Sequence, residues 1–189
     1  MRHSINFYMK KNKSGFTLIE ILVVVAIIGI LVAIVTLNFN DARKKSRDEI
    51  RKNELKTLQL AIETYKIQNG EYPASGCGQI ARHWSGPGPQ ASWGTACEDY
   101  IVGLVPNYIK ELPKDPNQEY VDSKGYIYST NADRSGYKLL SNYSVETNFV
   151  TSYSDEFARC PRACDVCASG GLQRDVYAVY GGGDSAECW

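Results

Sequence analysis

Apolar residues run without a charge from Ile21 to Leu37, where only Gly29 and Thr36 interrupt the aliphatic series. A run of this length is sufficient to cross a bilayer as a helix. Because it is apolar on every side, it predicts a helix that lies in lipid or among other apolar helices. Glu20 stands at the start of this run. A carboxylate inside a membrane-spanning segment is costly, so Glu20 is a candidate functional residue.

The pattern changes after Asp41 to that of an amphipathic helix. No Gly or Pro occurs from Asp41 to Gln68, and Asn69-Gly70 followed by Pro73 forms a typical helix stop. One face is expected to be buried, and it carries Leu55, Leu58, Ile62 and Tyr65 at spacings of three and four, with Ile50 and Ala61 near it. The opposite, polar face carries Lys52, Lys56, Glu63 and Lys66.

Three short segments rich in aromatic and β-branched residues predict strands at 125–129, 136–140 and 176–180. The polar stretch 131–135 predicts a turn between the first two. The predicted fold class is therefore α+β, with one long N-terminal helix packed on a small antiparallel sheet. Most of the 13 tyrosines are expected to pack on that sheet.

The residues before the apolar run carry a family resemblance. Lys13-Ser14-Gly15 is followed by Phe16-Thr17-Leu18-Ile19-Glu20 and then by the apolar helix. This string resembles the class III signal of type IV pilins and type II secretion pseudopilins. The resemblance implies cleavage between Gly15 and Phe16 by a prepilin peptidase, methylation of the new N-terminus at Phe16, and a basic leader with Lys10, Lys11 and Lys13. It also implies that Glu20 meets the N-terminal amine of a neighbouring subunit during filament assembly.

A second stretch, roughly residues 62–140, resembles the major pseudopilins. It contains Asn69-Gly70-Glu71-Tyr72-Pro73, then Leu112-Pro113-Lys114-Asp115-Pro116, then Tyr126-Ile127-Tyr128. The two prolines of the middle motif fix φ and are expected to rigidify a loop. The fold that the resemblance implies is pilin-like.

The expected organisation has four parts: a cleaved leader at 1–15, a membrane or filament-core helix at 16–40, an amphipathic helix at 41–70, and a globular head at 71–189. The resemblance places the leader in the cytoplasm and the head outside, with a single span in the cytoplasmic (inner) membrane. The charge bias does not decide this orientation, because lysines and arginines flank the apolar run on both sides.

All six cysteines follow the apolar run, and an even number in an exported domain predicts disulfides. A bridge from Cys77 to Cys97 would close the Gly/Ser/Pro-rich loop at 75–100 and stabilise it by about 3 kcal/mol. Zinc is an alternative for the remaining four, although only one Cys-x-x-Cys is present. Their pairing is left open; they are Cys160, Cys164, Cys167 and Cys188.

Candidate chemistry beyond this is sparse. The formal net charge of zero gives no general attraction to nucleic acid. Neither histidine, His3 nor His83, lies in a catalytic motif, so no enzyme activity is expected. Major pseudopilins often end in an acidic, calcium-binding loop, whereas this chain ends in a cysteine-rich tail. Oxygen ligands for calcium exist, but their spacing matches no calcium loop, so no cofactor and no ligand set is predicted; they are Asp155, Glu156, Asp175 and Asp184.

We therefore expect a structural subunit of a type IV pilus or a type II secretion pseudopilus. Its implied partners are copies of itself, other pilins, the prepilin peptidase, an assembly platform with its ATPase, and membrane lipid before assembly. The alternative is a membrane-tethered binding module that does not polymerise and captures a ligand with its Trp/Tyr loop. The signal does not distinguish secretion from adhesion, motility or DNA uptake, nor a major from a minor subunit.

Overall fold

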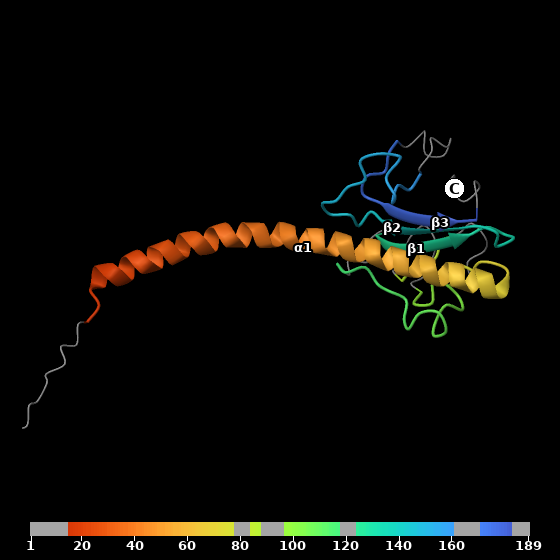
Figure 1. Cartoon of the computed structure of the whole chain (residues 1–189), viewed down its shortest axis with the longest axis horizontal. Helices are drawn as coiled ribbons and strands as arrows, with labels where there is room; N and C mark the ends of the chain where they lie inside the picture. The colour runs from red at the N-terminus through yellow and green to blue at the C-terminus, as the bar shows by residue number, and fades with distance from the viewer. Residues whose placement is uncertain (1–14, 78–83, 88–96, 118–123, 161–170, 183–189) are drawn as a thin grey trace, which may run out of the picture. The chain divides into compact units, whose positions relative to one another are not determined.

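The computed structural model describes residues 15–77, 84–87, 97–117, 124–160 and 171–182 (Figure 1). The chain divides into two compact units, Met1–Asn40 and Asp41–Trp189. The helix α1, Leu18–Asn69, contributes residues to both units.

In the first unit, α1 exposes its apolar side chains on all sides. From Phe16 to Ile34 the large hydrophobic residues are exposed, from 48% at Val23 to 88% at Leu18. Among the described residues, one helix, α1, is long and apolar enough to cross a membrane. Such a surface is unfavourable in water and requires lipid or other apolar helices around it.

The second unit contains a three-stranded antiparallel sheet in the order β1-β2-β3. Its strands are β1 Gly125–Thr130, β2 Tyr137–Asn142 and β3 Tyr177–Gly181. Ile127 pairs with Leu140, which in turn pairs with Ala178, so the three strands are in register across the sheet. This arrangement confirms the predicted α+β class and the positions of all three strands.

The C-terminal part of α1 runs along one face of the sheet in Figure 1. Alternation along each strand produces two faces. The face toward the helix carries four tyrosines and two aliphatic residues that share a core with the helix; they are Tyr126, Tyr128, Tyr137, Leu139, Tyr177 and Val179. From α1 this core receives Leu55, Leu58, Ala61 and Ile62, so the predicted buried stripe is confirmed, as is the packing of tyrosines on the sheet. Ile50 is the exception, because its side chain is 41% exposed.

The opposite face of the sheet holds a smaller cluster. It is formed by Ile127, Leu140, Val176 and Ala178, and Trp84 packs against it. Ser85, next to Trp84, pairs with Tyr128 through two backbone hydrogen bonds of 2.8 Å. This contact covers part of the outer edge of β1, where an unpaired strand would invite pairing with another chain.

The helix ends where the sequence predicts. Gly70 has φ +79°, and its N–H donates to the carbonyl of Lys66 at 2.8 Å. A left-handed residue after the last turn satisfies a carbonyl that would otherwise lack a donor, and glycine adopts this conformation without a Cβ clash.

The structure joins Cys77 and Cys97 by a disulfide, which closes the loop between them. Cys160 is also disulfide-bonded. The other three predicted disulfide cysteines, Cys164, Cys167 and Cys188, lie outside the described residues.

Candidate functional site

The Gly15–Phe16 bond lies in a non-helical segment directly before α1. Residues 15–17 have no regular structure, and both Gly15 and Phe16 are exposed. Among the described residues, nothing lies within 4 Å of a Cβ added at Gly15. The described part of the fold therefore gives no packing reason for glycine at position 15.

Glu20 caps its own helix. Its Oε2 accepts the backbone N–H of Thr17 at 2.8 Å and the Thr17 hydroxyl at 2.7 Å, and the Glu20 N–H donates to Thr17 Oγ1 at 3.4 Å. This reciprocal pattern is a capping box, in which two side chains satisfy N–H groups that have no partner in the first turn. Both bonds to the carboxylate end on the same oxygen, Oε2.

The surface around Glu20 is apolar. A hollow of about 430 Å³ lies beside the carboxylate, and its other lining residues are Phe16, Ile19, Ile21, Val23 and Val24. An exposed carboxylate in such surroundings is well placed to bind a cation once lipid or protein excludes water, because Coulomb attraction grows as the effective dielectric constant falls.

Those remaining predicted site residues that the structure describes do not gather into a second centre. The leader lysines, Lys10, Lys11 and Lys13, lie outside the described residues, as does Asp184. In the described part, Asp155 accepts the N–H of Phe157 at 3.0 Å, and Glu156 pairs with Lys56. No group of three His, Cys, Asp or Glu residues suited to a metal ion occurs among the described residues.

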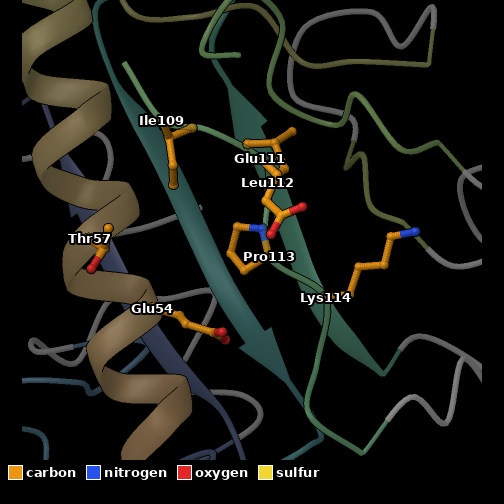
Figure 2. A pocket seen from close by; sticks show the side chains of 7 residues that line it. All are labelled: Glu54, Thr57, Ile109, Glu111, Leu112, Pro113 and Lys114. Carbon is orange, nitrogen blue, oxygen red and sulfur yellow. The ribbon is translucent and has the colours of Figure 1, made fainter. Parts of the chain in front are cut away.

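A groove in the second unit is a candidate for ligand capture. It has a volume of about 550 Å³ and lies between α1, which contributes Glu54 and Thr57, and the loop from Ile109 to Lys114 (Figure 2). Glu54 accepts a hydrogen bond from the buried Tyr126 hydroxyl. Burial raises the pKa of Glu54, whereas this hydrogen bond lowers it. Lys114 at the rim pairs with Glu98 at 2.6 Å. Glu54 and Lys114 are thus both engaged within the chain, by Tyr126 and Glu98.

The hydrophobic periodicity of the sequence does not reveal the buried ion pair between Asp48 and Arg51. Asp48 and Arg51 both have fully buried side chains and pair at 2.8 Å. An acid and a base three residues apart on a helix can interact, but the same spacing is common on exposed faces. The signal that could have found them is their place on the same side of the helix as Leu55 and Leu58.

Comparison with known proteins places these features in a family. Residues 10–36 match the prokaryotic N-terminal methylation motif. The chain is 33% identical over 110 residues to type II secretion system core protein G of Aeromonas hydrophila, covering 57% of this chain and 69% of that protein.

Two further relatives carry the same description. The protein from Vibrio cholerae is 34% identical over 110 residues, covering 57% of this chain and 69% of the relative. The protein from Pseudomonas aeruginosa is 31% identical over 109 residues, covering 57% and 70%. No solved structure matches the chain significantly. With its methylation motif, its pilin-like α+β fold and these relatives, the chain belongs to the type II secretion system core protein G family, whose members are structural pseudopilins and not enzymes.

Proposed function

We propose that the chain is a pseudopilus subunit that is cut between Gly15 and Phe16, methylated at Phe16, and assembled through α1 with Glu20 paired to a neighbour. Residues 1–15 are the leader, 16–40 the membrane and filament-core segment, 41–70 the amphipathic helix, and 71–189 the head. The observation that carries this proposal is an exposed Gly15–Phe16 bond directly before an all-apolar helix whose first turn holds Glu20.

The geometry supports processing at this bond. A peptidase needs an accessible backbone, and residues 15–17 are exposed and lie before α1 without regular structure. Among the described residues, none would contact a side chain at position 15, which supports a requirement for glycine that is set by the peptidase. Cleavage leaves Thr17 and Glu20 in place, so the capping box persists in the mature chain.

The first unit supports assembly by its surface. Its exposed aliphatic side chains are solvated favourably by lipid before assembly and by the helices of other copies afterwards. On assembly, the Glu20 carboxylate then passes from contact with water into an apolar environment. There a charged carboxylate needs a cation as a partner. The N-terminal amine at Phe16 of another copy supplies that cation, and pairing it with Glu20 fixes how far one helix is displaced along the next.

The second unit adds an uncharged outer stripe on α1. Six residues at alternating spacings of three and four form it; they are Ile50, Asn53, Thr57, Leu60, Thr64 and Ile67. Leu60 is 70% exposed and Ile67 83%. The hydroxyls of Thr57 and Thr64 donate to the carbonyls of Asn53 and Leu60, at 2.9 and 2.7 Å. Depletion of charge is typical of interface centres, so this outer stripe favours contact with another copy.

The relatives favour secretion over adhesion, motility or DNA uptake. The proteins from Aeromonas hydrophila, Pseudomonas aeruginosa and Vibrio cholerae are each named type II secretion system core protein G. The partners that follow are a prepilin peptidase, an inner-membrane platform with its ATPase, and other pseudopilins. The head lies outside the cytoplasmic membrane.

Two substitutions separate the charge of Glu20 from its cap. Glu20→Gln keeps an acceptor for Thr17 but removes the charge, whereas Thr17→Ala removes the side-chain part of the cap and keeps the charge. In cells that assemble the wild-type chain, we expect Glu20→Gln to lower the sheared filament fraction at least about tenfold, because an unpaired amine is left in an apolar contact. Thr17→Ala should assemble at near the wild-type level.

The membrane fraction of each variant is the control, because both should remain anchored by the apolar helix. Wild-type filament levels from Glu20→Gln would contradict the assembly role. If the wild-type chain itself entered no filament fraction when expressed with a pseudopilus assembly system, that result would instead favour the tethered binding module.

A further inference from the structure

Three acidic side chains from three separate segments meet one buried arginine in the second unit. Arg51, on α1, donates from Nε and Nη2 to the two oxygens of Asp115, both at 2.8 Å. Its Nη1 donates to Asp48 at 2.8 Å and to Glu146 at 3.0 Å. Asp115 belongs to the loop before β1, and Glu146 to the segment after β2. A single guanidinium therefore ties both segments to the helix.

Asp48 holds the segment after β2 in a second way. Its carboxylate accepts the backbone N–H groups of three successive residues: Glu146 at 3.0 Å, Thr147 at 2.7 Å and Asn148 at 2.9 Å. The Thr147 hydroxyl donates to the same carboxylate at 2.9 Å. Successive N–H groups that point at one anion form a nest, and here the anion belongs to the chain itself.

Further cations surround the cluster. Arg47 donates through Nε to Glu146 at 2.7 Å and forms an ion pair with it. Lys124 lines the adjoining cavity of about 230 Å³ together with Arg51 and Asp115. Asp48, Asp115 and Glu146 are thus already paired with basic side chains of the chain itself, Arg51 and Arg47, and Lys124 lines the adjoining cavity.

The resemblance to major pseudopilins implies calcium in an acidic loop, and Asp48, Asp115 and Glu146 are carboxylates that converge on one point, at Arg51. Calcium takes six to eight oxygen ligands at about 2.3–2.6 Å. The segment from Glu146 to Asn148 directs N–H donors toward the centre, where a calcium site would need carbonyl oxygens. The oxygens of Asp48 and Asp115 already accept bonds from Arg51 and from the backbone. These residues do not fit calcium.

We propose that the Arg51-centred ion-pair network holds the segment after β2 against α1 in place of calcium, so that the second unit keeps its fold without a divalent cation. The fully buried guanidinium of Arg51 neutralises the carboxylates of Asp48, Asp115 and Glu146, as a bound metal cation would do. This inference concerns the stability of the fold and stands independently of processing and assembly.

The direct test is thermal unfolding of the full chain in detergent micelles, followed by near-ultraviolet circular dichroism of its aromatic residues. We compare the chain with added calcium chloride and with excess EGTA. Equal midpoints are the expected result. A midpoint that falls on addition of EGTA and recovers with calcium would overturn the proposal, and this measurement requires no variant.

A matched pair of variants tests the role of Arg51 itself. Arg51→Gln removes the central cation, whereas Arg43→Gln removes an exposed arginine from the same helix. Removing one partner of a buried ion pair is strongly destabilising, so we expect Arg51→Gln to lower the midpoint by about 10 °C or more. Arg43→Gln should leave it nearly unchanged. Equal midpoints for the two variants would contradict the proposal.

Discussion

Asp48, which is fully buried, and Glu146, which is partly buried, show how a carboxylate stays charged away from water. Burial raises the pKa of Asp48, but the N–H groups of Asn148, Glu146 and Thr147 outweigh it and hold that pKa below its ordinary value. The hydrogen bond from Arg47 is the largest cause that lowers the pKa of Glu146. Both carboxyls therefore bind protons less readily in the folded chain than in the unfolded one.

This difference predicts acid sensitivity. The stability that a depressed carboxyl contributes is fully present above its unfolded pKa, about 4 for Asp and Glu, and is lost as the pH falls through the lower, folded pKa. We expect the free energy of unfolding to fall steeply below about pH 4, and less steeply in Asp48→Asn. Denaturant titrations over a pH series measure these slopes.

The control for this titration is Asp41→Asn, which removes an exposed carboxylate from the same helix. Its slope should match that of the wild type. If the free energy of unfolding of Asp48→Asn also kept the wild-type dependence on pH, the hydrogen-bond donors around Asp48 would not be stabilising its charged form.

At the scale of the element, α1 is one helix with two kinds of surface. In the first unit its apolar residues face outward on all sides. In the second unit an apolar face is buried against the sheet, while the outer stripe is uncharged and its Ile50, Leu60 and Ile67 are exposed. The change from one pattern to the other occurs without a break in the helix.

Two leucines two residues apart test this division. Leu58 is fully buried, whereas Leu60 is 70% exposed. We expect Leu58→Ala to lower the free energy of unfolding by about 2–5 kcal/mol, because it leaves a cavity in the core. Leu60→Ala should change it by less than about 0.5 kcal/mol. Denaturant unfolding compares the two, and equal losses would contradict the assignment of faces.

At the scale of the whole molecule, local patterns predicted most of the fold. The apolar run, the stripe from Leu55 to Ile62 and the three strands each follow from periodicity within a few residues, so the sequence reveals them. The Arg51 network does not follow in this way, because Asp115 and Glu146 are distant from Arg51 along the chain. A charged residue is by default expected at the surface, and only the folded arrangement shows that partners gather around it.

The candidate assembly site was predictable for a different reason. Glu20 is conspicuous because a carboxylate beside an uninterrupted apolar run is costly, and this cost is visible without any tertiary contact. Its bonds to Thr17 are also encoded locally, because Thr17 and Glu20 form a Thr-x-x-Glu capping box.

The central claim is that the chain is a processed filament subunit, and the mass of its mature form tests this most directly. We would co-express the full chain with a prepilin peptidase, purify it from membranes, and determine its intact mass and its N-terminal residue. The account predicts a product that begins at methylated Phe16. A chain that keeps its leader, or one that is cut at another bond, would contradict the account.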